Sequence, residues 1–334
     1  MNSTFNEVNL GILESIIEID DVRDISCNPD GSIYVTSNTK GNYRHHETIN
    51  ELEVVRIANQ IANKMEKEFN PSNPFLEGEI DKKDFVIRVS VFHKHLTNNT
   101  ALTLRKVTKN NILTTKGMIE SNYATNEVLE LLKRYVEAGV NILVIGETGS
   151  GKTQLVKWMA NYIPNNQRII TVEDSMEFQL PLLYPHKNVL EVRVKGGLTY
   201  SNVIAKCLRQ NLQWLLLQEA REVEVDDLLD GMSNGCKVIT TMHADETVGI
   251  TTRILQMLKL DSSSYDSLNN RIHSLIDVVI CIKKTDDNGI RRFISSIVEL
   301  DYTNLKPSNY IVYKQGESLK EHSPKLKGKL CKVI

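Results

Sequence analysis

The hydrophobic pattern of residues 1–110 predicts a small domain that mixes strands with one long helix. Apolar and polar residues alternate, as they do in half-buried strands, at residues 32–36, 85–91 and 101–107. Residues 48–69 instead carry apolar side chains at the spacing of an amphipathic helix, which Pro71 and Pro74 are expected to end. We therefore expect an α+β N-terminal domain over residues 1–110.

The pattern changes after a polar segment at residues 111–121, which we expect to be a linker. Short apolar runs then alternate with helical segments, an order typical of a parallel sheet with helices on both faces. Strands are predicted at residues 141–145, 167–172, 214–218, 236–241, 278–283 and 292–300, and helices at 126–138, 154–162, 201–211 and 222–232. We expect an α/β domain over residues 122–305, followed by a lysine-rich, weakly patterned and partly disordered tail at residues 306–334.

Composition is that of a soluble globular protein from a reducing compartment such as the cytosol. The 334 residues suit two domains, and 41% hydrophobic with 25% charged residues is ordinary for such a protein. A net charge of −2 gives no general attraction to nucleic acid. We expect no transmembrane helix and no signal peptide. The five scattered cysteines include no Cys-x-x-Cys pair, which argues against a disulfide framework or a cysteine-based zinc site.

The segment GETGSGKT fits the phosphate-binding pattern G-x-x-x-x-G-K-[ST] at each fixed position. It lies between a predicted strand and a predicted helix, the context that this motif requires. The glycine-rich turn and the helix N-terminus together form an anion site of backbone N–H groups. Lys152 is expected to reach the β- and γ-phosphates, and the Thr153 hydroxyl to ligate Mg²⁺. The motif therefore predicts binding of ATP and Mg²⁺ by Gly146, Glu147, Thr148, Gly149, Ser150, Gly151, Lys152 and Thr153.

Three further predicted strands end in acidic or histidine side chains: Glu173 with Asp174, Glu219, and His243. In an open α/β sheet, ligands bind beyond the carboxyl ends of the strands, so these side chains are expected to converge on the nucleotide. A carboxylate in such a place can hold Mg²⁺ or orient the attacking water. A solvated loop is the alternative for any one of these segments, but three of them beside a phosphate loop favour a catalytic site.

Four stretches carry a resemblance to a known family. Residues 138–153 follow the pattern AG-x-NILV-x-G-x-TGSGKT, and residues 171–178, TVEDSMEF, are similar to the family's Asp box. Residues 218–221, QEAR, stand where its Walker B stretch has GE-x-R, and residues 240–244, TTMHA, are similar to its His box. Over about residues 85–300 the chain thus resembles the motor ATPases of type II and type IV secretion, type IV pilus and archaeal flagellar assembly, in their CpaF-like branch.

The resemblance implies a RecA-like P-loop NTPase motor domain preceded by a smaller α+β domain, with ATP hydrolysis as the activity. Glu219 would be the Walker B glutamate that polarises the attacking water. His243 would sense the γ-phosphate or the border between subunits. Glu173 and Asp174 would lie near Mg²⁺ and the γ-phosphate, Glu173 as a catalytic group and both as metal ligands.

The resemblance also implies that arginines of the N-terminal domain clamp the phosphates. Arg88 and Arg105 are the candidates, because the guanidinium is planar, permanently charged and able to bind two oxygens at once. Arg209 and Arg221 are weaker candidates for the same task. For each of these arginines, a surface charge is the alternative interpretation.

As a family member the chain would act in a homo-oligomeric ring, expected to be a hexamer. The ring would lie at the cytoplasmic face of the inner membrane, beside a platform protein of a secretion, pilus or conjugation machine. No direct nucleic-acid binding is expected, and the near-neutral charge disfavours a nucleic-acid-translocating ATPase.

The Walker B region departs from the family pattern at four positions. Leu212 and Gln213 replace Pro-Asp, Gln218 replaces a glycine before Glu219, and Glu222 replaces another glycine. Slow turnover is therefore possible, and the alternative hypothesis is a catalytically weak, nucleotide-binding structural subunit of the ring.

Two weaker signals lie outside the predicted nucleotide site. His93 and His95 lie on one face of a predicted strand, as metal ligands can, but no third ligand is evident. Exposed strand polarity is therefore the favoured interpretation. Lysines within residues 320–332 could contact an acidic lipid surface or a partner, although a solvated tail is the usual explanation.

Overall fold

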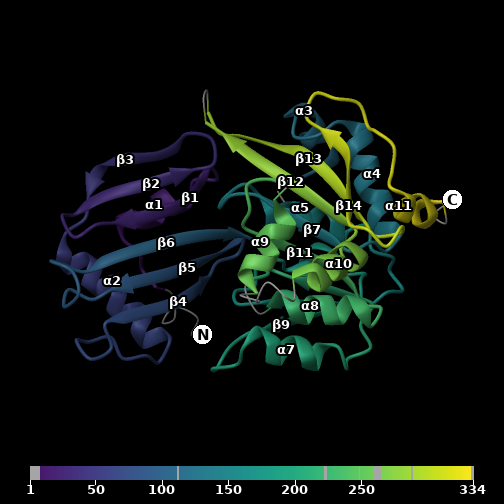
Figure 1. Ribbon diagram of the computed structural model, residues 1–334. Helices are drawn as coiled ribbons and strands as arrows, with labels where there is room; N and C mark the ends of the chain where they lie inside the picture. The colour runs from purple at the N-terminus through teal and green to yellow at the C-terminus, as the bar shows by residue number, and fades with distance from the viewer. Residues whose placement is uncertain are drawn as a thin grey trace. The chain divides into compact units, whose positions relative to one another are not determined.

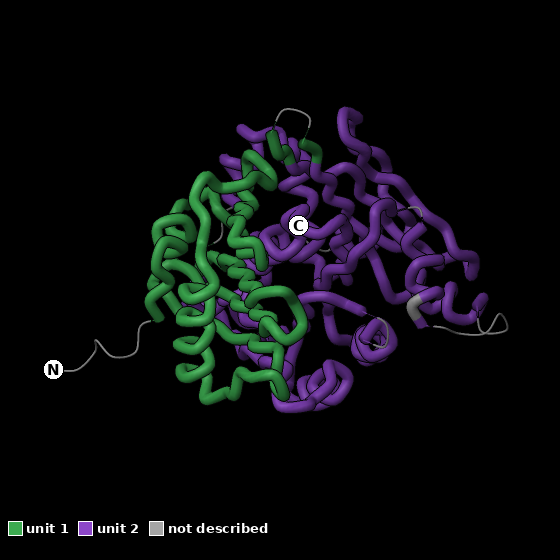
Figure 2. The backbone as a smooth tube through the Cα atoms, turned by 90° about the vertical axis from the view of Figure 1, so that its left-hand side faces the viewer, with its two compact units in different colours: residues 1–110, 285–291 green, residues 111–284, 292–334 purple. Residues whose placement is uncertain are grey.

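The computed structural model describes residues 8–110, 113–221, 224–247, 249–258, 265–286 and 289–331. The chain forms two compact units, coloured separately in Figure 2: Met1–Asn110 with Thr285–Arg291, and Asn111–Lys284 with Arg292–Ile334. Each unit has its own sheet, with buried apolar side chains packed against it. Glu222 and Lys332, which enter the sequence predictions, lie outside the described residues.

The first unit is built on a six-stranded antiparallel sheet in the order β3-β2-β1-β6-β5-β4 (Figure 1). Its elements are α1 (Ile12–Ile17), β1 (Val22–Cys27), β2 (Ser32–Ser37), β3 (Gly41–Thr48), α2 (Glu51–Lys64), β4 (Phe75–Asp81), β5 (Phe85–Phe92) and β6 (Ala101–Thr108). The three strands predicted for this domain are β2, β5 and β6. Apolar side chains of α1 and α2, among them Leu13, Ile57 and Ile61, pack with those of the sheet into one core.

Helix α2 ends earlier than predicted. It begins after Asn50, whose side chain accepts a backbone N–H of the first turn at 2.9 Å, the usual role of an N-cap residue. It ends at Lys64, because Glu66 takes a left-handed φ of 52° and the Lys67 N–H donates back to the last turn at 3.0 Å. Pro71 therefore follows the helix and does not end it.

The second unit is built on an eight-stranded sheet in the order β14-β13-β12-β7-β11-β10-β8-β9. The strands from β12 to β9 run parallel to their neighbours, and β14 runs antiparallel to β13. The elements are α3 (Thr115–Glu120), α4 (Asn126–Glu137), β7 (Ile142–Ile145), α5 (Lys152–Ala160), β8 (Ile169–Glu173), α6 (Leu180–Leu183), β9 (Val189–Arg193), α7 (Tyr200–Cys207), β10 (Trp214–Leu217), α8 (Glu224–Ser233), β11 (Lys237–Met242), α9 (Ile250–Met257), α10 (Tyr265–Leu275), β12 (Val278–Thr285), β13 (Arg291–Asp301), β14 (Ser308–Lys314) and α11 (Pro324–Leu330).

Helices cover both faces of this second sheet, and β7 shows how the sequence divides them. Ile142 and Val144 belong to a core shared with α3, α4, α5 and α11. Leu143 and Ile145 belong to a second core, shared with α7, α8, α9 and α10. β7 is therefore buried on both faces, as its continuous apolar run predicts for a central parallel strand.

Two segments beyond the predicted limits of the α/β domain are ordered parts of the second unit. The predicted linker contains α3, where Met118 is buried. The predicted C-terminal tail contains β14 and α11. β14 is the edge strand of the sheet, and Leu326 and Leu330 of α11 lie in the core. Among the described residues, no helix has the length and apolar character needed to cross a bilayer.

Buried acidic residues hold the lysine-rich helix α11 against the sheet. Lys325 and Lys329 pair with the fully buried Asp277 at 3.0 and 2.8 Å. The equally buried Glu299 accepts the N–H of Ser323, the N-cap residue of α11, at 2.7 Å. These two lysines therefore pair with a buried carboxylate, which would be costly if left unpaired. The Lys325 side chain is mostly buried, whereas 40% of the Lys329 side chain remains exposed.

Candidate nucleotide-binding site

The predicted phosphate loop leaves the central strand β7 through three glycines in unusual conformations. Gly146, Gly149 and Gly151 have φ angles of 152°, 77° and 96°, which residues with a Cβ rarely adopt. A Cβ on Gly146 would also lie 2.4 Å from the carbonyl oxygen of Ile282 and 2.7 Å from Ser150 Oγ. The loop can therefore pass this close to β12 only with glycine at position 146.

Lys152 opens helix α5 directly after the loop and is almost fully buried. Its ammonium donates to the carbonyl oxygens of Gly146 and Glu147 at 2.7 and 3.0 Å, so the side chain curls over the loop. Burial lowers the pKa of Lys152 to about 8, against the opposing effect of the carboxylates of Glu219 and Glu147. An anion bound at this loop would stabilise the charged form of the lysine and raise its pKa again.

Lys152, His243 and Glu219 come from three separate motifs and form one chain of contacts. Lys152 Nζ lies 3.3 Å from His243 Nδ1, and His243 Nε2 lies 3.2 Å from Glu219 Oε1. The other carboxylate oxygen of Glu219 accepts a hydrogen bond from Arg221 Nη2 at 2.9 Å. Glu219 and His243 follow β10 and β11, and β11 lies beside β7. Adjacent strand ends therefore bring these groups together, as the sequence predicts.

The structure makes Glu173 a buried anchor for the segment that follows it. The side chain is fully buried, and one carboxylate oxygen accepts the N–H groups of Glu177 and Phe178 at 2.7 and 2.8 Å. Burial raises the pKa of Glu173 to about 8, although those two hydrogen bonds favour the charged form. In this structure the carboxylate thus holds the segment that follows it, and the catalytic and metal-binding role of Glu173 stays a prediction.

Asp174, the next residue, lies close enough to Arg221 for its charge to act on that guanidinium. It is only partly buried. The hydrogen bond to Glu219 and, more weakly, the charge of Asp174 raise the pKa of Arg221. Asp174 thus lies within electrostatic reach of the chain of contacts that ends at Arg221, and it stays a candidate metal ligand.

Gln218, which stands in place of the family's glycine, is accommodated by hydrogen bonds. Its N–H donates to the carbonyl of Val172 at 3.1 Å, and its own carbonyl accepts the Thr241 hydroxyl at 2.7 Å. Its side-chain oxygen accepts the N–H of Asp174 at 3.2 Å. The extra side chain therefore adds one hydrogen bond, to the segment after β8, while the two backbone bonds are ones that a glycine could also make, and Glu219 next to it still meets His243.

Arg209, a weaker candidate for the phosphate clamp, lies away from this constellation. It is exposed in the segment between α7 and the first residue of β10. The phosphate loop, Glu219 and His243 follow the last residues of their strands. The two ends of the strands lie on opposite sides of a parallel sheet. Arg209 therefore lies at the end remote from the phosphate loop of its own chain.

Arg292 on β13 contacts the phosphate loop and was missed by sequence reasoning. Its Nε donates to the carbonyl oxygen of Gly149 at 2.9 Å. Its Cδ is the atom nearest to a Cβ built on Gly151, at 3.7 Å. Arg292 therefore supports the loop, which lies 143 residues earlier in the chain. Its position at the start of an ordinary strand gives no local signal of this contact.

The first unit places the two other predicted clamp arginines side by side. Arg88 on β5 and Arg105 on β6 are direct cross-strand partners, in a row that continues to Glu79 on β4 and Asp24 on β1. Arg105 Nε donates to the carboxylate of Asp24 at 2.6 Å, and half of the Arg105 side chain remains exposed. A charge-assisted hydrogen bond of this kind orients the guanidinium.

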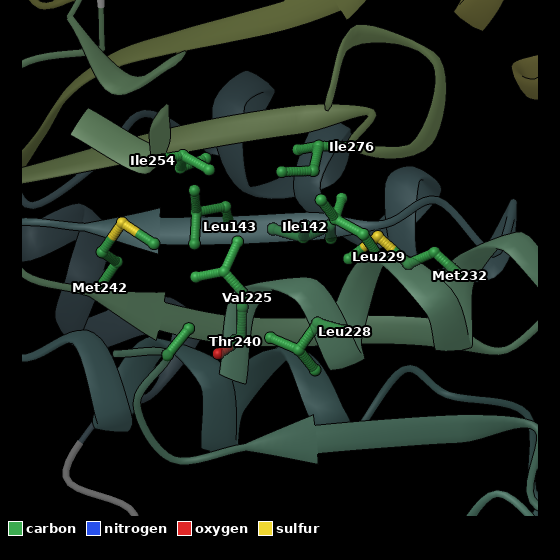
Figure 3. Close-up of a pocket in the computed structure, with 11 residues that line it drawn as sticks. Ile142, Leu143, Val225, Leu228, Leu229, Met232, Thr240, Met242, Ile254 and Ile276 are labelled. Carbon is green, nitrogen blue, oxygen red and sulfur yellow. The ribbon is translucent and has the colours of Figure 1, made fainter. Parts of the chain in front are cut away.

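A small pocket between β7, β11, α8 and α9 has walls unlike those of a nucleotide site (Figure 3). Its side chains are those of Ile142, Leu143, Ala220, Val225, Leu228, Leu229, Met232, Thr240, Met242, Ile254 and Ile276. Only Thr240 among them is polar. We interpret the pocket as a gap in the packing behind Ala220 and Met242, the neighbours of Glu219 and His243.

The second unit has the site of a P-loop nucleoside triphosphatase. A glycine-rich loop joins a central parallel strand to a helix, with a lysine, a carboxylate and a histidine together beyond the strand ends. The family model described as type II/IV secretion system protein matches residues 41–298, and the chain belongs to this family. It is a family of ATPases, and this chain is an ATPase of that family. The predicted family and fold class are thereby confirmed, while the CpaF-like branch stays a prediction.

Individual relatives agree with this assignment. An uncharacterized protein of Bacillus anthracis, pXO2-25, is 28% identical over 87% of this chain and 68% of its own length. The type IV secretion system protein PtlH of Bordetella pertussis is 31% identical over 50% of this chain, which matches about half (52%) of PtlH. Among solved structures, the pilus retraction motor PilT with bound ADP superposes with a TM-score of 0.63 at 20% identity, covering 85% of this chain and 80% of PilT. At that identity the likeness shows the fold alone.

Proposed function

We propose that the chain binds ATP with Mg²⁺ at the phosphate loop and uses Glu219 to polarise the water that attacks the γ-phosphate. The observation that carries this proposal is the chain of contacts from Lys152 through His243 to Glu219. It joins Lys152, which is expected to contact the phosphates, to Glu219, which is expected to polarise the attacking water. The residues proposed to hold the nucleotide are Gly146, Glu147, Thr148, Gly149, Ser150, Gly151, Lys152 and Thr153.

The loop fits a polyphosphate on two counts. Its glycines leave no Cβ between the backbone and a bound oxygen, and the first N–H groups of α5 border the same space. Thr153 and Asp174 are the proposed Mg²⁺ ligands, because both are oxygen donors of the type that this ion prefers. Bound Mg²⁺ would supply neutralising charge for the β- and γ-phosphate oxygens.

His243 is proposed as a sensor, because it contacts both Lys152 and Glu219. A change in what Lys152 binds can reach the Glu219 carboxylate through a single imidazole ring. The neutral ring can donate at only one of its two nitrogens, so a new partner at Nδ1 changes what Nε2 offers to Glu219.

At pH 8.5 the protein is expected to take up a proton from solution when it binds nucleotide, and Lys152 is the group that accepts it. Burial holds its pKa at about 8 in the free protein, and bound phosphates would raise it. Above pH 8, Lys152 is largely neutral in the nucleotide-free protein and charged in the nucleotide complex. Near pH 6.5 it is charged in both, so no uptake is expected there. Calorimetric titration of ADP in buffers of different ionisation enthalpy measures the uptake. Lys152→Arg should bind without it, because arginine does not titrate in this range; equal uptake by both proteins would contradict the assignment.

Arg88 and Arg105 are proposed as the phosphate clamp, and the arrangement in the first unit supports this. The two arginines stand directly opposite each other on neighbouring strands, with an acidic residue at each end of the row, and Asp24 orients the Arg105 guanidinium. Arg105→Ala should lower ATP turnover by roughly 10–100-fold. This is below the roughly 10³-fold value of a lone arginine finger, because Arg88 remains. Lys94→Ala, a cation removed near the end of β5, is the matched control. An unchanged rate for Arg105→Ala in a folded protein would make Arg105 a surface charge.

We further propose that the chain works as a ring, with six copies as the expected number, at the cytoplasmic side of a membrane and beside a platform protein of a secretion or pilus machine. The names of the relatives support the kind of machine alone: PtlH is a secretion system protein and PilT a pilus retraction motor. Light scattering of the full chain with and without ADP and Mg²⁺ tests the assembly. A monomer under both conditions, at concentrations where ATP is hydrolysed, would contradict a ring.

The alternative, a structural subunit with little turnover, rests on the altered Walker B stretch. Gln218 is the departure closest to the chemistry, and its hydrogen bonds leave Glu219 in contact with His243. We therefore favour the active motor. An ATPase measurement on the assembled protein separates the two hypotheses.

A further inference from the structure

Strand β3 places two histidines and a glutamate together at an edge of the first unit's sheet. The side chains are those of His45, His46 and Glu47, and one possible ligand atom from each lies within 4.8 Å of the others. The two imidazole rings have centroids 4.3 Å apart, and His45 Nδ1 lies 3.8 Å from Glu47 Oε2. We propose that these three residues bind a transition-metal dication of the Zn²⁺ class. His45 Nδ1 accepts the backbone N–H of Glu47 at 3.3 Å, so Nε2 is the nitrogen of His45 that would bind the metal.

A bulge in β3 explains how three consecutive residues can share one site. In a regular strand, His46 would point to the face opposite that of His45 and Glu47. Here Tyr34 pairs with Arg44 and Ser32 pairs with Thr48, so three residues of β3 lie opposite the single Ile33 of β2. Extra residues of this kind break the alternation and re-aim side chains. The bulge therefore turns a polar stretch of strand into a cluster.

The donor set decides which ions fit. Two imidazole nitrogens and one carboxylate oxygen suit Zn²⁺, Ni²⁺ or Cu²⁺, whereas Mg²⁺ and Ca²⁺ prefer oxygen ligands throughout. His45 is mostly shielded, with 14% of its side chain exposed, and Glu47 is open to solvent at 46%. Three protein ligands on an edge strand leave a coordination position for water or for a side chain of another molecule.

The other histidine pair of this unit makes a matched control. His93 packs edge-on against Phe69 at 5.1 Å, and its Nδ1 accepts the N–H of His95 at 3.1 Å. This pair is not part of the His-Cys-Asp-Glu cluster that the described residues form. Replacing it removes as many imidazoles as replacing His45 and His46, without touching the proposed site.

Equilibrium dialysis of the full chain against Zn²⁺ tests the proposal, with bound metal measured by elemental analysis and nucleotide and Mg²⁺ left out. The wild type and His93→Ala/His95→Ala should each retain one ion per chain at the same free Zn²⁺. His45→Ala/His46→Ala should lose it. Glu47→Gln should weaken binding at least about tenfold, since even the outer partners of metal ligands are worth about 10–100-fold in affinity.

Two results would overturn the proposal. One is no stoichiometric Zn²⁺ on the wild type. The other is equal retention by the wild type and His45→Ala/His46→Ala. Melting temperatures in the absence of metal show whether the variants fold. Because Glu47 is half-exposed, Glu47→Gln keeps the test decisive even if the double variant is unstable.

Discussion

Replacing Lys152 by alanine is expected to abolish ATP hydrolysis, with a loss of roughly 10³-fold or more. Removal of a single preorganised hydrogen-bond donor at a developing charge costs about 10²–10³-fold, and Lys152 carries a full charge. It is also the link between the phosphate loop and His243. Initial rates of phosphate release at saturating ATP and Mg²⁺ measure the effect.

Lys116→Ala is the matched control for this variant, because Lys116 lies on α3 with 85% of its side chain exposed. Its turnover should equal that of the wild type. Lys152→Ala should fold normally, since the lost side chain is polar and its desolvation is itself unfavourable. If folded Lys152→Ala hydrolysed ATP within tenfold of the wild-type rate, the phosphate loop would not be the site of hydrolysis.

Glu219→Gln is expected to keep nucleotide binding and to lower turnover by roughly 10²–10⁴-fold, the range of a lost general base or water-orienting carboxylate. The amide keeps the shape of the side chain, but it lacks the charge that meets His243 and Arg221 at 3.2 and 2.9 Å. ADP affinity and the rate of phosphate release, measured on the same preparation, separate binding from chemistry.

Glu173→Gln provides the sharpest comparison. The Glu173 carboxyl is buried, its pKa is raised to about 8, and it accepts two backbone N–H groups. An amide oxygen can accept the same two bonds, so turnover should stay within about tenfold of the wild type. If Glu173→Gln lost as much activity as Glu219→Gln, Glu173 would be the catalytic residue that its place in the sequence suggests.

The convergence of Lys152, Glu219 and His243 could be predicted because the carboxyl ends of parallel strands lie at the same end of a sheet. The apolar runs before Gly146, Glu219 and His243 identify three such strands, and their adjacency follows from the fold class. For Glu173 the same logic locates the backbone but not the direction of the side chain. Here the carboxylate turns to two N–H groups of its own loop.

Other features could not be predicted because their partners are distant in sequence. Arg292 meets the carbonyl of Gly149 only because β12 and β13 follow β7 in the sheet. Lys325 and Lys329 look like solvated charges until Asp277 is placed beneath them. The cluster at His45 depends on a bulge, which strand periodicity does not foresee.

The rate of Mg²⁺-dependent phosphate release by the purified full chain, measured over a range of protein concentrations with the mass followed by light scattering, tests the central claim most directly. A motor with the site described should hydrolyse ATP, require Mg²⁺, and turn over faster per chain as it assembles. A chain that assembles and binds nucleotide, yet releases no phosphate above the Glu219→Gln background at any concentration, would contradict this account and identify a structural subunit.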